Sequence, residues 1–107
     1  YAYTSAYCAS KHALVGLTRA LAVEYARAGV TFNAVCPGFV ETEMTTRAVE
    51  RIQKTTGRDA GAARAALEAL SVQKRLMTPE EVAHAVFMLV PHEARGINGQ
   101  AIGLDGG

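Results

Sequence analysis

The sequence has few of the residues that mark a disulfide-bonded, metal-binding or membrane-spanning protein. It holds two cysteines and three histidines in 107 residues, and neither set has the spacing of a metal site. Without secretory features, Cys8 and Cys36 are expected to stay reduced as small buried side chains, which favours a cytoplasmic protein. No apolar run approaches the roughly 20 residues that a membrane helix needs. We therefore expect no metal site and no membrane span.

Charge of one sign is also scarce. Eleven basic and ten acidic residues leave a formal net charge of +1. The basic residues are scattered, which excludes a nucleic-acid groove and a polybasic membrane patch. Half of the residues are hydrophobic, so the chain is globular rather than disordered. Its length allows one small domain, residues 1–107.

The sequence begins with Tyr1 rather than methionine and shows no signal peptide. We therefore expect it to be a piece of something longer, or a mature form.

The sequence does contain a tyrosine and a lysine four residues apart, Tyr7 and Lys11, at the start of a long apolar-striped segment. On a helix such residues share one face, about 5–6 Å apart at Cβ. The ammonium group and the positive end of the helix dipole both favour a phenolate over a phenol. Such a tyrosine can exchange a proton with an alcohol or ketone oxygen. Taken alone, however, this spacing is more often a solvated lysine beside a packed ring.

The segment after this pair predicts a helix followed by a strand. Apolar residues at helical spacing predict a helix over 7–28 that faces a neighbour with one stripe and ends at Gly29. Val30–Cys36 is short, apolar and rich in β-branched residues, which predicts a buried strand. A helix, a tight turn and a buried strand make half of a βαβ unit. The sequence therefore predicts the α/β class with a parallel sheet.

Pro37-Gly38 ends this strand. Ligands of open parallel sheets bind just beyond the carboxyl ends of the strands. We therefore expect residues 37–42 to lie where a ligand binds.

Residues 41–75 differ from their surroundings. They contain one amphipathic stretch, a break at 54–59 and an alanine-rich helical stretch over 60–70. We interpret 44–75 as a substrate-binding loop or lid over the ligand edge; an ordinary pair of surface helices is the alternative.

The last third of the chain carries a strong helix start. Thr78 and Glu81 have the spacing of a capping box, with Pro79 in the first turn. The helix is expected to run to Pro91 with its apolar side buried. Residues 100–105 then predict a last strand.

Three stretches together carry a specific resemblance. Residues 7–18 (YCASKHALVGLT), 30–42 (VTFNAVCPGFVET) and 97–107 (INGQAIGLDGG) resemble the short-chain dehydrogenase/reductase family, in that family's order and over essentially the whole chain. The resemblance implies the C-terminal portion of a Rossmann-type, doubly wound parallel sheet. It also implies an oxidoreductase that uses NAD or NADP, works on a small-molecule alcohol or ketone, and assembles as a homotetramer.

The resemblance implies roles for six residues. Tyr7 would be the catalytic acid/base, and Lys11 would activate it and hold the nicotinamide ribose. Pro37, Gly38, Val40 and Thr42 would contact the nicotinamide end of the cofactor through backbone and hydroxyl groups.

The sequence also departs from the family pattern. The glycine-rich loop, the early asparagine and the catalytic serine that precedes the tyrosine are absent from residues 1–107. Because the missing parts bind the pyrophosphate and polarise the substrate oxygen, we expect residues 1–107 alone to be inactive. The strand end that distinguishes NAD from NADP is missing as well.

The expected function of the parent enzyme is the interconversion of a secondary alcohol and a ketone, with a 3-hydroxyacyl or 3-ketoacyl thioester as one candidate substrate. A non-catalytic fragment or family member with an assembly or regulatory role is the alternative. A small helical binding module is a further rival, although the Pro37-Gly38 strand end argues against it.

Overall fold

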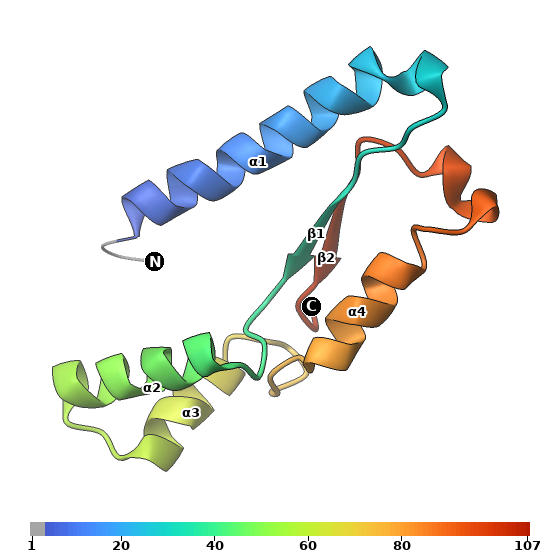
Figure 1. The fold of residues 1–107 in the computed structure, drawn as a ribbon. Coiled ribbons are helices and arrows are strands. Elements are labelled where there is room, and N and C mark those ends of the chain that lie inside the picture. The colour runs from blue at the N-terminus through green and yellow to red at the C-terminus, as the bar shows by residue number, and fades with distance from the viewer. Residues whose placement is uncertain (1–3) are drawn as a thin grey trace. The chain divides into compact units, whose positions relative to one another are not determined.

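A computed structural model describes residues 4–107. Its contacts divide the chain into two compact units, residues up to Val35 with Phe87–Ile102, and Cys36–Val86 with Gly103–Gly107. The elements are, in order, α1 (Ser5–Glu24), η1 (Ala26–Ala28), β1 (Ala34–Pro37), α2 (Glu43–Thr56), α3 (Ala60–Glu68), α4 (Pro79–Phe87), η2 (His92–Gly96) and β2 (Ala101–Leu104) (Figure 1). The alternation of helices and strands confirms the predicted α/β class.

In the first unit, α1 differs from the predicted helix at both ends. It begins at Ser5, with Thr4 as N-cap, two residues before the predicted start at residue 7. The helix ends at Glu24 rather than at residue 28. A separate 3-10 turn, η1, follows and ends at Gly29, whose φ of 73° lies in the left-handed region that glycine tolerates best. The predicted stop at Gly29 is therefore confirmed, although two helical elements precede it.

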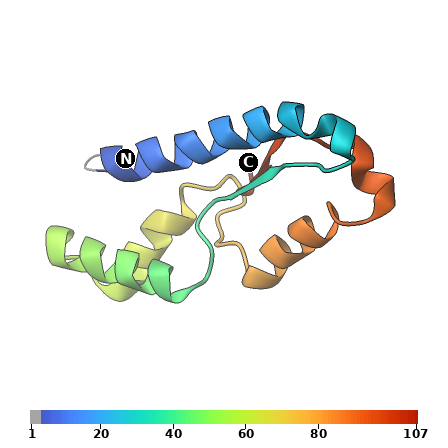
Figure 2. The ribbon, with the colours of Figure 1, turned by 45° about the horizontal axis from the view of Figure 1, so that its top comes forward.

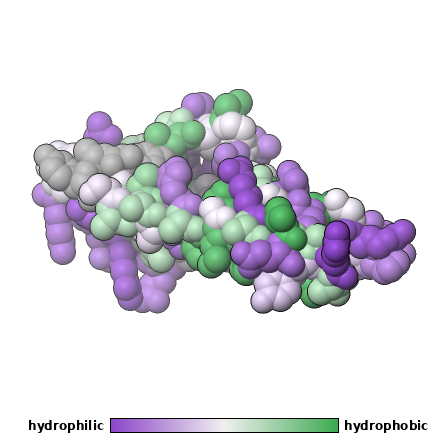
Figure 3. Space-filling model, turned by 90° about the horizontal axis from the view of Figure 1, so that it is seen from above, coloured by the Kyte–Doolittle hydropathy of each residue, from purple (hydrophilic) through white to green (hydrophobic). Residues whose placement is uncertain are grey.

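The predicted apolar stripe of α1 has little cover among the described residues. Ala22 is the buried residue of this helix, whereas Leu14 and Leu17 are 52% and 53% exposed. Hydrophobic side chains, drawn in green, reach the surface between hydrophilic ones in Figure 3. An apolar face of this kind commonly marks an interaction surface.

The two strands pair in parallel register. The Ala34 N–H donates to the Gln100 carbonyl over 2.8 Å, and the Gly38 N–H donates to the Leu104 carbonyl over 3.0 Å. The strand predicted over 30–36 is therefore displaced, because β1 begins at Ala34 and includes Pro37.

In the residues before β1, side-chain amides make hydrogen bonds to the backbone in place of the backbone–backbone bonds of a strand pair. Asn33 Nδ2 donates to the Ile97 carbonyl over 2.8 Å, and Asn33 Oδ1 accepts from the Gln100 N–H over 3.1 Å. Asn98 Oδ1 accepts from the Phe32 N–H over 2.9 Å, and Asn98 Nδ2 donates to the Ala22 carbonyl over 2.9 Å. These bonds join the end of α1 to the two segments that lead into β1 and β2.

The second unit contains α2 and α3, which lie side by side in Figures 1 and 2. Gly57 ends α2 with a φ of 69°, and the Asp59 side chain caps α3 by accepting from the Ala62 N–H over 2.7 Å. The predicted break is therefore shorter than 54–59. The buried apolar residues of this unit are Ala63, Leu67, Leu76 and Met77.

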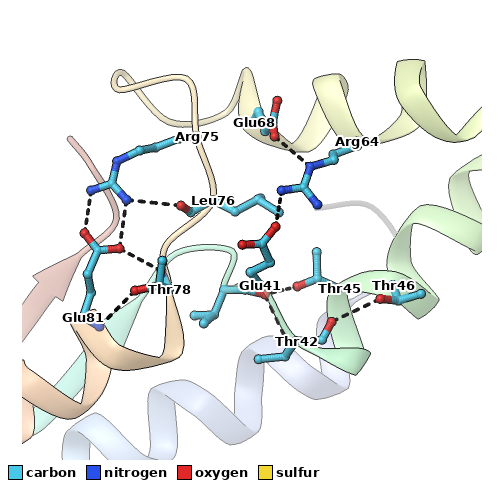
Figure 4. A network of polar contacts seen from close by, with 11 residues as sticks. Glu41, Thr42, Thr45, Thr46, Arg64, Glu68, Arg75, Leu76, Thr78 and Glu81 are labelled. Atoms are coloured by element: carbon cyan, nitrogen blue, oxygen red, sulfur yellow. Dashed lines mark hydrogen bonds and ion pairs between the residues drawn. The ribbon is translucent and has the colours of Figure 1, made fainter.

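The predicted capping box at the start of α4 is confirmed. The Glu81 N–H donates to Thr78 Oγ1 over 3.2 Å, and the Thr78 N–H donates to Glu81 Oε2 over 2.7 Å. Arg75 adds a two-pronged ion pair with the Glu81 carboxylate, with nitrogen–oxygen distances of 2.8 and 2.6 Å (Figure 4). The predicted extent of the helix is wrong, since α4 ends at Phe87 and not at Pro91.

The apolar side of α4 is not buried as expected. Val86 and Phe87, for example, are 48% and 67% exposed. The described residues therefore do not cover the apolar side of α4.

The capping box should make the intact protein acid-sensitive. The Arg75 side chain, followed by the Thr78 N–H, lowers the pKa of Glu81 from 4.5 to about 2. A lowered folded-state pKa contributes stability above pH 4.5, and this stability is lost as the pH falls toward 2. We predict that Glu81→Gln lowers the free energy of unfolding near neutral pH and that its difference from wild type shrinks below pH 4.5. Denaturant titrations at several pH values measure this, and a difference independent of pH would contradict it.

Gly106 should tolerate alanine less well than Gly29. Both have positive φ, 76° and 73°, but an added Cβ at Gly106 would collide with the Ser71 hydroxyl, whereas Gly29 faces open space. We predict that Gly29→Ala costs about 1–2 kcal/mol of unfolding free energy through its backbone alone. Gly106→Ala should cost about 1–3 kcal/mol more through overpacking. Equal costs in thermal unfolding of the intact protein would show that the Ser71 contact does not matter.

Candidate active site

Tyr7 and Lys11 lie together on the first turns of α1. The Lys11 ammonium nitrogen is 5.4 Å from the centroid of the Tyr7 ring, within the range of a cation–π contact. The Tyr7 side chain is 60% exposed. The predicted pairing on one helix face is therefore present, and the phenol is accessible.

The helix holds this pair through its backbone. The Cys8 N–H donates to the Thr4 carbonyl over 2.8 Å and closes the first turn. The Ser10 hydroxyl donates to the Tyr7 carbonyl over 2.7 Å. Thr4 is the N-cap of this helix, and its side chain makes no capping hydrogen bond.

The charge around this turn favours an anion. The first turn of α1 contains no acidic residue, so this turn itself has no carboxylate that would neutralise the positive end of the helix dipole. Lys11 adds a full positive charge on the same face. Together, the helix end and the lysine can stabilise negative charge that develops on the Tyr7 oxygen.

Cys8 corrects one expectation about this turn. It is a free, exposed cysteine rather than a buried one. The imidazole of His12 lies next to it, with Nδ1 2.8 Å from the Cys8 carbonyl oxygen. Because a carbonyl oxygen only accepts, His12 Nδ1 is the donor in this contact.

The other predicted site residues lie in the second unit, at the end of β1. Pro37 is the last residue of the strand. An added Cβ at Gly38 would lie 3.1 Å from both Cα and Cβ of Asp105. A side chain here would force the segment that follows β2 to shift, so this close approach favours glycine.

The backbone of Val40 has a free donor. A parallel bridge pairs Val40 with Met77, whose N–H donates to Phe39 and whose carbonyl accepts from Glu41. The peptide groups of Val40 itself therefore point away from Met77. Its carbonyl accepts from the Thr45 hydroxyl, and no described residue accepts from its N–H. A ligand carbonyl could fill that place.

Thr42 is both a site residue and the N-cap of α2. Its carbonyl accepts from the Thr45 and Thr46 N–H groups over 3.0 and 3.1 Å. Its hydroxyl makes no capping bond and lies 3.4 Å from the Val40 carbonyl oxygen. A weak bond of this length leaves the hydroxyl able to turn toward a ligand.

The carboxylate of Glu41, inside the predicted ligand segment 37–42, has an ion-pair partner that the sequence does not indicate. Glu41 makes an ion pair with Arg64 of α3, and Arg64 also contacts Glu68 over 2.9 Å. The Glu68 partner could have been found from its i,i+4 spacing. The Glu41 partner is 23 residues away, and no local pattern indicates it.

Residues 4–107 carry neither of two further classes of site. No group of three or more histidine, cysteine, aspartate or glutamate side chains in this range could hold a metal ion. No helix in the same range is long and apolar enough to cross a membrane.

Comparison with known proteins identifies the family. The family model described as enoyl-(acyl carrier protein) reductase matches residues 1–107. A curated relative, the 3beta-hydroxysteroid dehydrogenase of Mediterraneibacter gnavus, is 38% identical over 113 residues, which cover 96% of this chain and 41% of the relative.

Solved structures agree with this match. A short chain dehydrogenase family protein from Francisella tularensis superposes with a TM-score of 0.95 at 28% identity, over 100% of this chain and 44% of its own. A variant of actinorhodin polyketide ketoreductase with NADPH gives a TM-score of 0.93 at 37% identity, over 100% and 41%. The predicted Rossmann-type fold is thus confirmed for the part that this chain covers.

The chain spans about two fifths of the length of the curated relatives that it matches. Its sequence match covers all of residues 1–107, and its fold agrees with the solved structures along its whole length. The chain therefore belongs to the short-chain dehydrogenase/reductase family.

Proposed function

We propose that the protein carrying this chain is an NAD(P)-dependent oxidoreductase that interconverts a secondary alcohol and a ketone. The observation that carries the proposal is the exposed Tyr7 phenol beside Lys11, on a helix end without a neutralising carboxylate. Membership of the short-chain dehydrogenase/reductase family supports it.

The residues at the end of β1 fit a nicotinamide. The free N–H of Val40 suits the carboxamide oxygen of the nicotinamide, and the weakly held Thr42 hydroxyl can add a second contact. Pro37 and Gly38 would shape the adjoining backbone, and Lys11 would hold the ribose. A solved relative contains NADPH. When bound, the cofactor supplies or takes up the hydride.

The protein's own part in the reaction is to bind the substrate and move one proton. In ketone reduction, the Tyr7 hydroxyl donates its proton to the carbonyl oxygen as that oxygen becomes an alkoxide. In alcohol oxidation, the Tyr7 phenolate takes the proton back. Lys11 and the end of α1 stabilise the phenolate in both directions.

For the substrate, we propose a 3-hydroxyacyl or 3-ketoacyl thioester. The matching family is described as an enoyl-(acyl carrier protein) reductase, whose named substrate is carried on acyl carrier protein, and one solved relative is a polyketide ketoreductase. A steroid is the rival, because another relative is a 3beta-hydroxysteroid dehydrogenase. An assembly or regulatory role without catalysis remains the alternative to both.

We further propose that 44–75 is a lid and that the protein is cytoplasmic. The paired helices α2 and α3 follow directly after the strand-end residues 39–42, which supports a lid next to those residues. The free cysteines Cys8 and Cys36 are consistent with a reducing compartment. Because the family's serine and glycine-rich loop lie outside residues 1–107, turnover is proposed for the intact protein only.

Removing the Tyr7 hydroxyl tests the proposed chemistry. With NADPH and a 3-ketoacyl thioester, Tyr7→Phe should lower turnover of the intact protein about 10²–10⁴-fold, the usual contribution of general acid catalysis. Lys11→Met should lower turnover and also weaken NADPH binding, measured by fluorescence titration.

Tyr25→Phe is the matched control for this prediction. Tyr25 lies at the end of α1, with its ring 5.6 Å from the ring of Phe32, so loss of its hydroxyl should leave the rate unchanged. Normal turnover in Tyr7→Phe, or unchanged NADPH affinity in Lys11→Met, would refute the assignment.

We propose a homotetramer for the intact protein. The exposed apolar residues of α1, among them Leu14 and Leu17, and its small residues Ala9, Ala13 and Gly16 favour pairing with a second copy across a two-fold axis. Sedimentation at micromolar concentration should give the mass of four chains. A monomer would contradict this.

A further inference from the structure

Arg64 on α3 lies between two carboxylates, one from its own helix and one from the segment before α2 (Figure 4). Its Nε is 2.9 Å from Glu68 Oε1, one turn further along the same helix. Its Nη2 makes an ion pair with Glu41, which precedes α2. These two contacts, that with Glu41 foremost, raise the pKa of Arg64. Arginine suits this place because its planar fork of donors can hold two carboxylates at once.

Glu41 is fixed beside the proposed nicotinamide contact. Its N–H donates to the Met77 carbonyl over 2.8 Å, next to the Val40–Met77 bridge. Its carboxylate reaches α3, which packs along α2. The ion pair therefore joins the α2–α3 pair to the strand-end residues 39–42 by a side-chain contact, in addition to the covalent chain.

We propose that Arg64 is a positioning residue, which holds the 44–75 lid against residues 39–42 through Glu41. The proposal rests on the function proposed above for those residues. Glu68 moves with Arg64, so it remains as a partner when the lid opens. Opening then breaks one ion pair without leaving the guanidinium unpaired.

The exposure of the contact sets its strength. The Arg64 and Glu41 side chains are 47% and 52% exposed, and ion pairs at the surface contribute little and are screened by salt. A weak contact suits a lid that must open in each cycle. Its loss should change the opening equilibrium by about two- to fivefold.

Hydrogen exchange of the ligand-free intact protein tests the contact directly. Arg64→Gln and Glu41→Gln should each speed exchange about two- to fivefold across both α2 and α3. Glu68→Gln is the matched control, because it removes the other carboxylate of the same arginine. It should affect only the last turn of α3. The double variant Glu41→Gln/Arg64→Gln should exchange no faster than either single variant.

Kinetics test whether the contact positions the lid. Glu41→Gln and Arg64→Gln should raise KM for the ketone about two- to fivefold and leave kcat and its pH profile unchanged. Arg64→Lys, which keeps the charge, should recover part of the affinity. High salt should reduce the difference between wild type and Glu41→Gln.

The outcomes separate this proposal from the proposed function. Unchanged exchange in both Glu41→Gln and Arg64→Gln would overturn the positioning role, as would equal loosening of α2 by Glu68→Gln. A decrease in kcat with an unchanged KM in these two variants would also overturn the positioning role. A protein without reductase activity that still shows the predicted exchange pattern would refute the proposed function and leave the Arg64–Glu41 tie supported.

Discussion

The parallel pairing of β1 with β2 is the constraint on which the other features depend. Each strand has only four residues, and the Phe32–Asn98 bond beside them joins residues that lie 66 apart in the sequence. Such a short ladder is weak by itself. The Asn33 and Asn98 side chains extend it at one end and join it to the Ala22 carbonyl of α1. At the other end, Gly38 allows the close approach of Asp105.

Both groups of proposed site residues depend on these attachments. In the first unit, the Asn98 bond holds the end of the helix that carries Tyr7 and Lys11 at its start. In the second unit, the Gly38 contact and the Val40–Met77 bridge fix the peptide groups at the end of β1. Among residues 4–107, few are buried in either unit, whereas apolar side chains of α1 and α4 are exposed.

Local sequence signals predicted the local features of the fold. The capping box of Thr78 and Glu81 and the stop at Gly29 were predicted because each depends on residues adjacent in the chain. The start of β1 was predicted wrongly, because a hydrophobic pattern does not show that side-chain amides take the place of backbone hydrogen bonds before the strand. The end of α4 was predicted wrongly, because the same pattern does not show which apolar residues lack a packing partner. The Tyr7–Lys11 face followed from helical spacing. The Glu41–Arg64 contact could not be predicted, since it depends on how α3 packs on α2.

The most direct test of the central claim is a crystal structure of the intact protein with NADP⁺. We predict that the Lys11 ammonium binds the nicotinamide ribose, that the Val40 N–H donates to the carboxamide oxygen, and that the Tyr7 hydroxyl faces the same side of the nicotinamide as the substrate. A nicotinamide bound away from both Tyr7 and Val40 would contradict the account.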